Sequence, residues 1–251
     1  MRGYELEAIF GEYERVLGLQ WPVKYYLQPN APTCQILSDA NSKEHRVYVN
    51  GTTYGNMDIM ISDVVHELGH AHLAEHIDPT FATIFFTDKW NKFSRENPEE
   101  FFRLMQELRF SWSHVDIWVN DLRHKHWPEF TLMDSTTFIQ GLKFMIQTKD
   151  ISFLEDPGIL LGIIQCQAEM MRHGLAELPT PFSLLMDSGM DIDSQINVVV
   201  EYFETLPALK FRLKKDLRLL EDSVKRMSQE LHFSIAPRLV REKGRWVWSL
   251  D

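Results

Sequence analysis

The chain has 251 residues and a formal net charge of −10 at pH 7, and this acidic balance argues against a nucleic-acid partner, which would need clustered cations. A hydrophobic fraction of 44% and a charged fraction of 25% are typical of a soluble globular protein and exclude a largely disordered chain. No apolar run approaches the roughly 18 residues that a membrane span requires, so we expect no membrane partner.

The first residues and the cysteines indicate a cellular location. Residues 1–7 carry charges where a secretory signal peptide would be apolar. The two cysteines, Cys34 and Cys166, lie far apart in the sequence and have no metal-ligand spacing, so we interpret each as a small buried hydrophobic residue. We therefore expect a reducing, cytoplasmic environment.

The N-terminal region predicts one helix followed by a small sheet. Residues 4–17 have apolar side chains at helical spacing, which indicates an amphipathic helix. Strand-like segments follow at residues 23–27, 33–37 and 46–50. We expect these segments to form a small antiparallel sheet.

A helix is predicted over residues 56–77, ending before Pro79, and it contains the motif H-E-x-x-H. His66 and His70 are four residues apart, so their side chains lie about 40° apart on one helix face, near enough to bind one metal ion. The opposite face has an apolar stripe that can meet a hydrophobic core. Its members are Ile61, Val64, Val65 and Leu68.

This combination of residues predicts zinc chemistry. Neutral imidazoles are good ligands for Zn²⁺, and the metal lowers the pKa of its bound water towards about 7. Glu67 projects about 100° away from His66 round the helix, so it can accept a proton from that water as a general base.

The motif and its apolar flanks resemble the HEXXH zinc peptidases, the zincins. The resemblance implies a Zn²⁺ cofactor and a peptide or protein substrate. It also implies that an edge strand of the sheet borders the cleft and can pair with an extended substrate.

A third protein ligand is needed, and the segment after Pro98 supplies candidates. Residues 98–126 predict one long helix that ends before Pro128. Asp116 lies about 40° from Trp112, at the edge of the apolar stripe, whereas Glu107 and His114 fall on the far side. The predicted buried stripe consists of Phe101, Met105, Leu108, Trp112, Val115, Val119 and Leu122.

Asp116 with Asn120 one turn later resembles the gluzincin arrangement. In that family the third ligand is a carboxylate on a separate helix, and a residue one turn later orients a ligating histidine. Here Asp stands in place of Glu and Asn in place of Asp. Asp116 is thus the implied third ligand, and Asn120 the residue that supports a ligand.

Two histidines stay open as alternative third ligands. His66, His70 and His76 have the spacing of the metzincin pattern, but Leu73 occupies the position of its glycine, so the chain has no easy way to leave the helix after His70. His114 is the other alternative.

A zincin also needs a donor that stabilises the transition state across the cleft. The plausible residues are Tyr54, which precedes the motif helix, and His124 or His126, which follow Asp116.

The rest of the chain is predicted to be mainly helical. Helices are expected at residues 135–148, 157–173 and 191–205. A last helix spaces its apolar residues by four and three, which favours either an antiparallel partner in the same chain or a homodimer. Residues 235–250 resemble a β-hairpin that turns at residues 242–244.

We therefore expect an α+β protein with a small antiparallel sheet, an HEXXH helix and a mainly helical C-terminal half. Residues 1–128 would form the zincin-like catalytic region and residues 129–251 the helical region, together making one compact unit. The predicted function is a zinc-dependent metallopeptidase, as a monomer or homodimer. The alternatives are a metal hydrolase acting on another bond, and a latent or degenerate zincin that binds or regulates.

Overall fold

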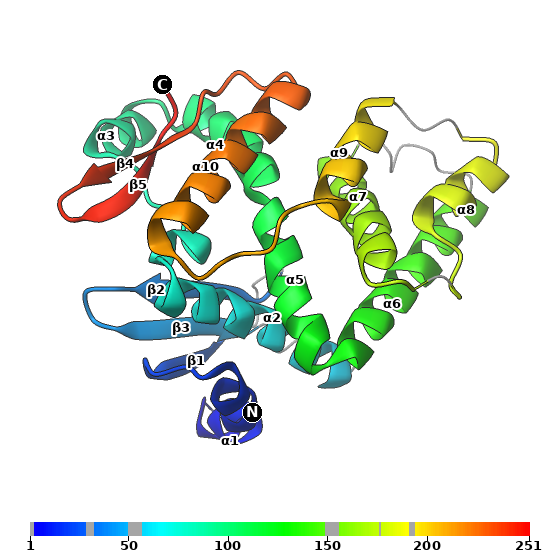
Figure 1. Cartoon of the computed structure of the whole chain (residues 1–251), viewed down its shortest axis with the longest axis horizontal. Helices are drawn as coiled ribbons and strands as arrows, with labels where there is room; N and C mark the ends of the chain where they lie inside the picture. The colour runs from blue at the N-terminus through cyan, green and yellow to red at the C-terminus, as the bar shows by residue number, and fades with distance from the viewer. Residues whose placement is uncertain (1–2, 29–32, 50–56, 149–155, 176, 191–193) are drawn as a thin grey trace. The chain divides into compact units, whose positions relative to one another are not determined.

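The computed structural model describes residues 3–28, 33–49, 57–148, 156–175, 177–190 and 194–251. It is a mixed α and β protein, mostly helical, with one sheet of three strands and one of two in the described residues (Figure 1). The helices are α1 (Gly3–Leu17), α2 (Met57–His76), the short 3-10 helix η1 (Pro79–Phe81), α3 (Asp88–Glu96), α4 (Pro98–Trp112), α5 (His114–His126), α6 (Pro128–Gln147), α7 (Pro157–Arg172), α8 (Pro181–Asp187), α9 (Ser194–Glu204) and α10 (Leu213–Glu230). The strands are β1 (Val23–Leu27), β2 (Gln35–Asp39), β3 (Glu44–Val49), β4 (Arg238–Glu242) and β5 (Arg245–Ser249).

Two compact units make up the chain. The first unit comprises Met1–Arg103, Leu209–Asp222 and Ala236–Asp251, and the second comprises Leu104–Ala208 and Ser223–Ile235. This division differs from the predicted single boundary at residue 128. The difference arises because the C-terminal hairpin and the start of α10 pack with the N-terminal region.

The three-stranded sheet has the order β1-β3-β2. β2 and β3 pair antiparallel through a short turn, as predicted, but β1 pairs with the other edge of β3 in parallel. The prediction of an antiparallel sheet is therefore wrong for β1. Local alternation of side chains predicts strands but not their directions, which depend on how the chain returns to the sheet.

Helices α1 and α2 form the layer that packs on this sheet. α2 contacts β2 and β3, and α1 contacts β1 and α2. The predicted amphipathic pattern of α1 is confirmed, since Leu6, Phe10 and Leu17 are buried. Gly18 follows α1 with a φ of 68°, the left-handed conformation that ends many helices.

The segment predicted as one helix over residues 98–126 is two helices, α4 and α5, separated at Ser113. Around this residue the backbone hydrogen bonds join residues three apart instead of four. Ser113 N–H donates to Phe110 O (3.2 Å), and Asp116 N–H donates to Ser113 O (3.0 Å). The Ser113 hydroxyl also donates to Phe110 O at 2.6 Å. A serine that competes for a helix carbonyl in this way commonly bends or interrupts the helix.

The predicted C-terminal hairpin is confirmed as the antiparallel pair β4–β5. Lys243 and Gly244 form its turn with φ values of 50° and 85°, which match the two-residue turns that suit a twisted hairpin. Trp248 is fully buried, and its backbone bonds to Phe85 O (2.7 Å) and Thr87 N–H (3.1 Å). These contacts place the hairpin in the first unit.

The second unit is built from helices. α7 packs against α6, α8 and α9, and a Cβ at Gly162 of α7 would lie 2.7 Å from the Phe138 ring of α6. Only glycine therefore permits this close approach. Both cysteines of the chain are free and buried, as predicted, and burial raises the pKa of the Cys166 thiol to about 12.

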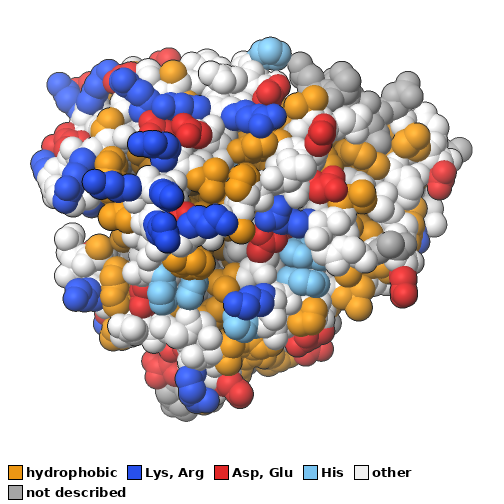
Figure 2. All heavy atoms as spheres, viewed as in Figure 1, with side chains coloured by type: hydrophobic (Ala, Val, Ile, Leu, Met, Phe, Trp, Pro, Cys, Tyr) orange, Lys and Arg blue, Asp and Glu red, His pale blue; other side chains and the backbone are white. Residues whose placement is uncertain are grey.

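On the surface of the first unit, Lys and Arg side chains gather over α10 and the β4–β5 hairpin (Figure 2). In the described part of the chain, none of the helices combines the length and the apolar character needed to cross a bilayer.

Candidate metal centre

The HEXXH motif lies in the middle of α2, and the predicted helix is confirmed. Val64, Val65 and Leu68 are at most 1% exposed, so the apolar face of α2 is buried in the core of the first unit. His66 and Glu67 are half-buried, and His70 is 5% exposed. The core therefore fixes the rotation of α2 and keeps the motif residues on its other side.

The two motif histidines face each other through the same ring nitrogen. His66 Nε2 and His70 Nε2 are 3.3 Å apart, and the rings meet edge to face with their centroids 5.0 Å apart. Two nitrogens bound to one tetrahedral Zn²⁺ at about 2.05 Å would lie about 3.3 Å from each other. The distance suits a shared zinc ion, and it also suits a hydrogen bond between one protonated and one unprotonated nitrogen.

The orientation of His70 is set by a backbone carbonyl. Its Nδ1 lies 2.8 Å from Phe81 O, and since a carbonyl oxygen can only accept, Nδ1–H is the donor. The neutral ring then carries its lone pair on Nε2, the atom that faces His66. Metal-binding histidines commonly have such a partner on their second nitrogen.

The turn that carries this carbonyl is itself held in place. Asp78 caps η1 by accepting hydrogen bonds from Thr80 N–H (3.0 Å) and Thr80 Oγ1 (2.9 Å). The Phe81 side chain is fully buried, and burial raises the pKa of Asp78 above its usual value. The Asp78-Pro79 stop signal of α2 therefore also positions the carbonyl that orients His70.

Asp116 and Asn120 belong to the second unit, where each bonds to a polar residue of α7. Asp116 is half-buried in the first turn of α5, and its Oδ2 accepts from Gln165 Nε2 at 3.0 Å. Asn120 is buried and donates through Nδ2 to Glu169 Oε1. Gln165 and Glu169 are not among the site residues predicted from the sequence. The pattern that could have indicated them is a pair of polar residues four apart in an apolar helix, because polar side chains need polar partners once they are buried.

The predicted position of His114 on the far, polar side of its helix is wrong. His114 is fully buried, because α5 is covered on nearly all sides and the break at Ser113 separates it from α4. Its Nδ1 donates to Ser111 O at 2.9 Å, and desolvation lowers its pKa to about 4. Within the described residues, its Nε2 has no hydrogen-bond partner. His114 is thus a neutral, buried imidazole in the second unit.

His76 lies in the unbroken last turn of α2, about 9 Å along the axis from His70. It is exposed, and its Nδ1 donates to His72 O at 2.9 Å. Its ring stacks on His72, whose Nδ1 donates to Leu17 O at 2.7 Å. The chain does not leave the helix after His70 as a metzincin-like site would require, so this arrangement gives no support to His76 as a ligand.

The proposed transition-state donors are scattered. Tyr54 lies outside the described residues. His124 and His126 are at the end of α5, at least two helical turns beyond Asp116, or about 12 Å. His124 stacks on His173 with centroids 4.1 Å apart, and His126 is exposed. Within the second unit, neither histidine lies beside Asp116.

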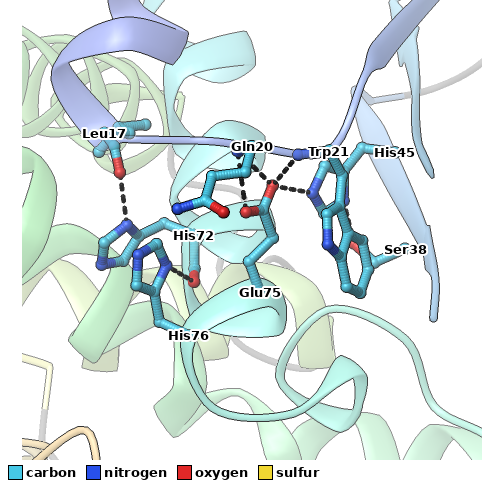
Figure 3. A network of polar contacts seen from close by, with 8 residues as sticks. All are labelled: Leu17, Gln20, Trp21, Ser38, His45, His72, Glu75 and His76. Atoms are coloured by element: carbon cyan, nitrogen blue, oxygen red, sulfur yellow. Dashed lines mark hydrogen bonds and ion pairs between the residues drawn. The ribbon is translucent and has the colours of Figure 1, made fainter. Parts of the chain in front are cut away.

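A carboxylate five residues after His70, that of Glu75, anchors α2 to the sheet (Figure 3). Glu75 accepts hydrogen bonds from the backbone N–H groups of Gln20 (2.9 Å) and Trp21 (2.8 Å) and from His45 Nε2 (2.9 Å). His45 Nδ1 in turn lies 2.8 Å from Ser38 Oγ. Ser38 and His45 are fully buried, so this Ser–His–Glu array is out of reach of a substrate and serves the fold.

We expect Glu75→Ala to lower the free energy of unfolding by about 3 kcal/mol, because it leaves two backbone donors and a buried imidazole without their acceptor. Urea unfolding at pH 7 measures this change. Glu12→Ala, which removes an exposed carboxylate from α1, should change the same quantity by less than about 0.5 kcal/mol. A loss below about 1 kcal/mol in Glu75→Ala would contradict an anchoring role.

The candidate metal centre is therefore defined in the first unit by His66, Glu67 and His70, with the Phe81 carbonyl behind His70. Comparisons of this chain with protein-family models, with curated proteins and with solved structures give no match.

Proposed function

We propose that this protein is a zinc-dependent hydrolase that cleaves peptide bonds. The observation that carries the proposal is the pairing of His66 Nε2 and His70 Nε2 at 3.3 Å, a separation suited to one tetrahedral ion. The hydrogen bond from His70 Nδ1 to Phe81 O supports it, because it leaves the lone pair of Nε2 available for a metal.

Asp116 is the third ligand in this proposal. His66, His70 and Asp116 together are a donor set that could hold a metal ion. Two imidazoles and one carboxylate are a common ligand set of catalytic zinc, which keeps a further position for water or substrate. Gln165 Nε2 would orient the Asp116 carboxylate through its 3.0 Å hydrogen bond to Oδ2.

When bound, zinc would act as a Lewis acid on a peptide carbonyl and would lower the pKa of a water molecule towards about 7. Glu67 would take a proton from the attacking water on its carboxylate and return it to the leaving nitrogen of the cleaved bond. Phe81 O would hold the His70 ring in place through this sequence by accepting its Nδ1–H.

A peptide substrate is favoured by the strand beside the motif helix. β2 packs on α2 and is an edge strand of the three-stranded sheet in the described residues. Ser38 N–H of β2 already donates to Thr83 Oγ1 (3.2 Å), and other backbone groups along an edge strand can bind an extended polypeptide. The resemblance to the zincins points to the same substrate class.

The test is cleavage of a peptide mixture by zinc-loaded protein, with new termini identified by mass spectrometry. We expect cleavage that a chelator abolishes and that added Zn²⁺, but not Mg²⁺, restores. If all peptides stay intact while an ester or simple amide is cleaved, the protein is a metal hydrolase of another class. If no substrate is cleaved by protein that has zinc bound, the hydrolase proposal fails.

A further inference from the structure

One short segment of the first unit concentrates exposed positive charge. Residues 210–218 lead into α10 and contain five basic side chains and one acid, a net charge of +4 in a chain whose net charge is −10. The acid, Asp216, is 1% exposed, whereas all five basic residues are exposed. The basic residues are Lys210, Arg212, Lys214, Lys215 and Arg218, and we call them with Phe211 and Leu213 the 210–218 surface (Figure 2).

The cations of this surface have no acidic partners in the described part of the chain. Some other exposed cations of the first unit do, such as Lys24 with Glu44 and Lys243 with Asp88, whereas others, such as Arg95, also have none among the described residues. The chain has 36 acidic residues to 26 basic ones, so partners are not scarce. The particular feature of residues 210–218 is their density, since five cations without an acidic partner among the described residues fall within nine positions of the sequence.

The backbone of the segment is held in an unusual conformation. Phe211 has a φ of 51°, a left-handed conformation that is uncommon for a bulky side chain. Asp216 maintains it by accepting hydrogen bonds from the N–H groups of Lys210 (2.8 Å) and Arg212. Despite its size, the Phe211 ring is 49% exposed, and the next apolar residue, Leu213, is 45% exposed.

The positive charges of this segment also interact unfavourably with the dipole of α10. Lys214 and Lys215 lie in the first turn of α10, where the helix dipole favours acids and disfavours cations. Unpaired cations, a strained exposed Phe and cations at a helix N-terminus each reduce stability. Such local costs gather in a native protein mostly where function requires them.

The segment lies beside the motif helix within the first unit. The Phe211 ring meets His72 edge to face, with centroids 5.5 Å apart, and lies 6.5 Å from His76. His72 and His76 are two and six residues beyond His70 on α2. The 210–218 surface therefore begins roughly 10–15 Å from the motif histidines, which three to five extended residues can span.

We propose that the 210–218 surface binds an acidic segment of the polypeptide substrate, a few residues from the bond that is cleaved. This proposal rests on the proposed peptidase function. The five cations would pair with substrate carboxylates, and Phe211 and Leu213 would contact an apolar side chain between them.

Other anionic partners fit less well. A long nucleic acid would extend beyond this surface over a protein whose charge is otherwise more negative than −10, and it would be repelled there. Binding to a membrane would bury little apolar surface. Leu217 and Leu220 of α10 are already buried, so within this segment only Phe211 and Leu213 could insert into a bilayer.

The test measures binding separately from cleavage. The probe is a fluorescein-labelled peptide of about ten residues with six acidic residues and one Leu, a length that can span the surface. Its binding to zinc-loaded Glu67→Gln protein is followed by fluorescence anisotropy. We expect the double variant K214E/K215E to weaken binding about tenfold or more, and Phe211→Gly, which permits the same backbone, to weaken it about threefold.

K92E/R95E in α3 is the matched control, because it makes the same change in net charge at exposed residues of the same unit. We expect it to change the affinity less than about twofold at physiological salt, because Lys92 and Arg95 are not part of the 210–218 surface and charges outside the binding site are screened. For cleavage of the acidic peptide by the parent enzyme, K214E/K215E should raise KM with kcat unchanged.

The inference is overturned if the acidic peptide does not bind, or if both charge-reversal variants weaken binding equally. Tighter binding to a single-stranded oligonucleotide or to phosphatidylserine vesicles would also overturn it. If K214E/K215E weakens peptide binding but the parent enzyme cleaves nothing, the surface stands as a peptide-binding site and the peptidase proposal fails.

Discussion

The His70→Ala variant is expected to lose its zinc almost completely, from about one ion per chain in the parent protein to less than about a tenth. His70 is buried, and its Nε2 faces His66 Nε2 at 3.3 Å. Without this nitrogen the site has one imidazole and one carboxylate, whereas catalytic zinc sites use three protein ligands. Elemental mass spectrometry of protein purified without added zinc measures the loss.

His76→Ala is the matched control, since it removes an exposed imidazole from the same helix and should leave the zinc content unchanged. His66→Ala alters a half-buried residue instead of a buried one, and it should lose zinc while keeping the circular dichroism spectrum of the parent protein. These two variants separate loss of a ligand from loss of the fold.

The Asp116→Ala variant tests whether Asp116 is the third zinc ligand. We expect this variant to lose its zinc as well. If zinc is retained in Asp116→Ala, the third ligand must be sought elsewhere, with His114 as the next candidate. If zinc is lost in His76→Ala, the metzincin-like alternative is restored. A folded parent protein that takes up no zinc would refute the metal centre itself.

The second large effect is expected on kcat, when Glu67 is replaced by glutamine. Glu67→Gln should keep about one zinc ion per chain and lower kcat for peptide cleavage by about 10² to 10⁴. Glutamine has nearly the same shape as glutamate, but its amide cannot accept the proton that the attacking water must lose. The rate is measured on the best peptide from the cleavage screen, with zinc content determined on the same sample.

Asp58→Asn provides the comparison, because Asp58 is an exposed carboxylate in the first turn of the same helix. It should leave kcat within about twofold of the parent enzyme, since surface substitutions have small effects. A zinc-loaded Glu67→Gln enzyme with the kcat of the parent would exclude Glu67 as the general base.

The features predicted correctly from the sequence depend on residues close together in the chain. The spacing of His66 and His70 on one helix face follows from the helical repeat, so the two motif imidazoles could be placed side by side without knowledge of the fold. The β4–β5 hairpin follows from a Lys243-Gly244 turn that tolerates positive φ. The amphipathic helix α1 follows in the same way from the spacing of its apolar residues.

The features that were wrong or missed depend on contacts between distant segments. The parallel pairing of β1 with β3, the burial of His114 and the polar partners Gln165 and Glu169 each require knowledge of what packs on the other side. The break at Ser113 shows that even a local element can change when one side chain competes for a backbone carbonyl.

By itself, the sequence determined that this protein has an HEXXH helix with an apolar face and a face that carries both motif histidines, because that pattern repeats with the helix. Only the tertiary structure decided that a carbonyl from η1 orients His70, that Glu75 anchors α2 to Gln20, Trp21 and His45, and that Phe211 lies beside α2. These contacts join residues that are 11 to 139 positions apart (81 − 70 and 211 − 72), and the periodicity of one helix contains no information on which distant group it will meet.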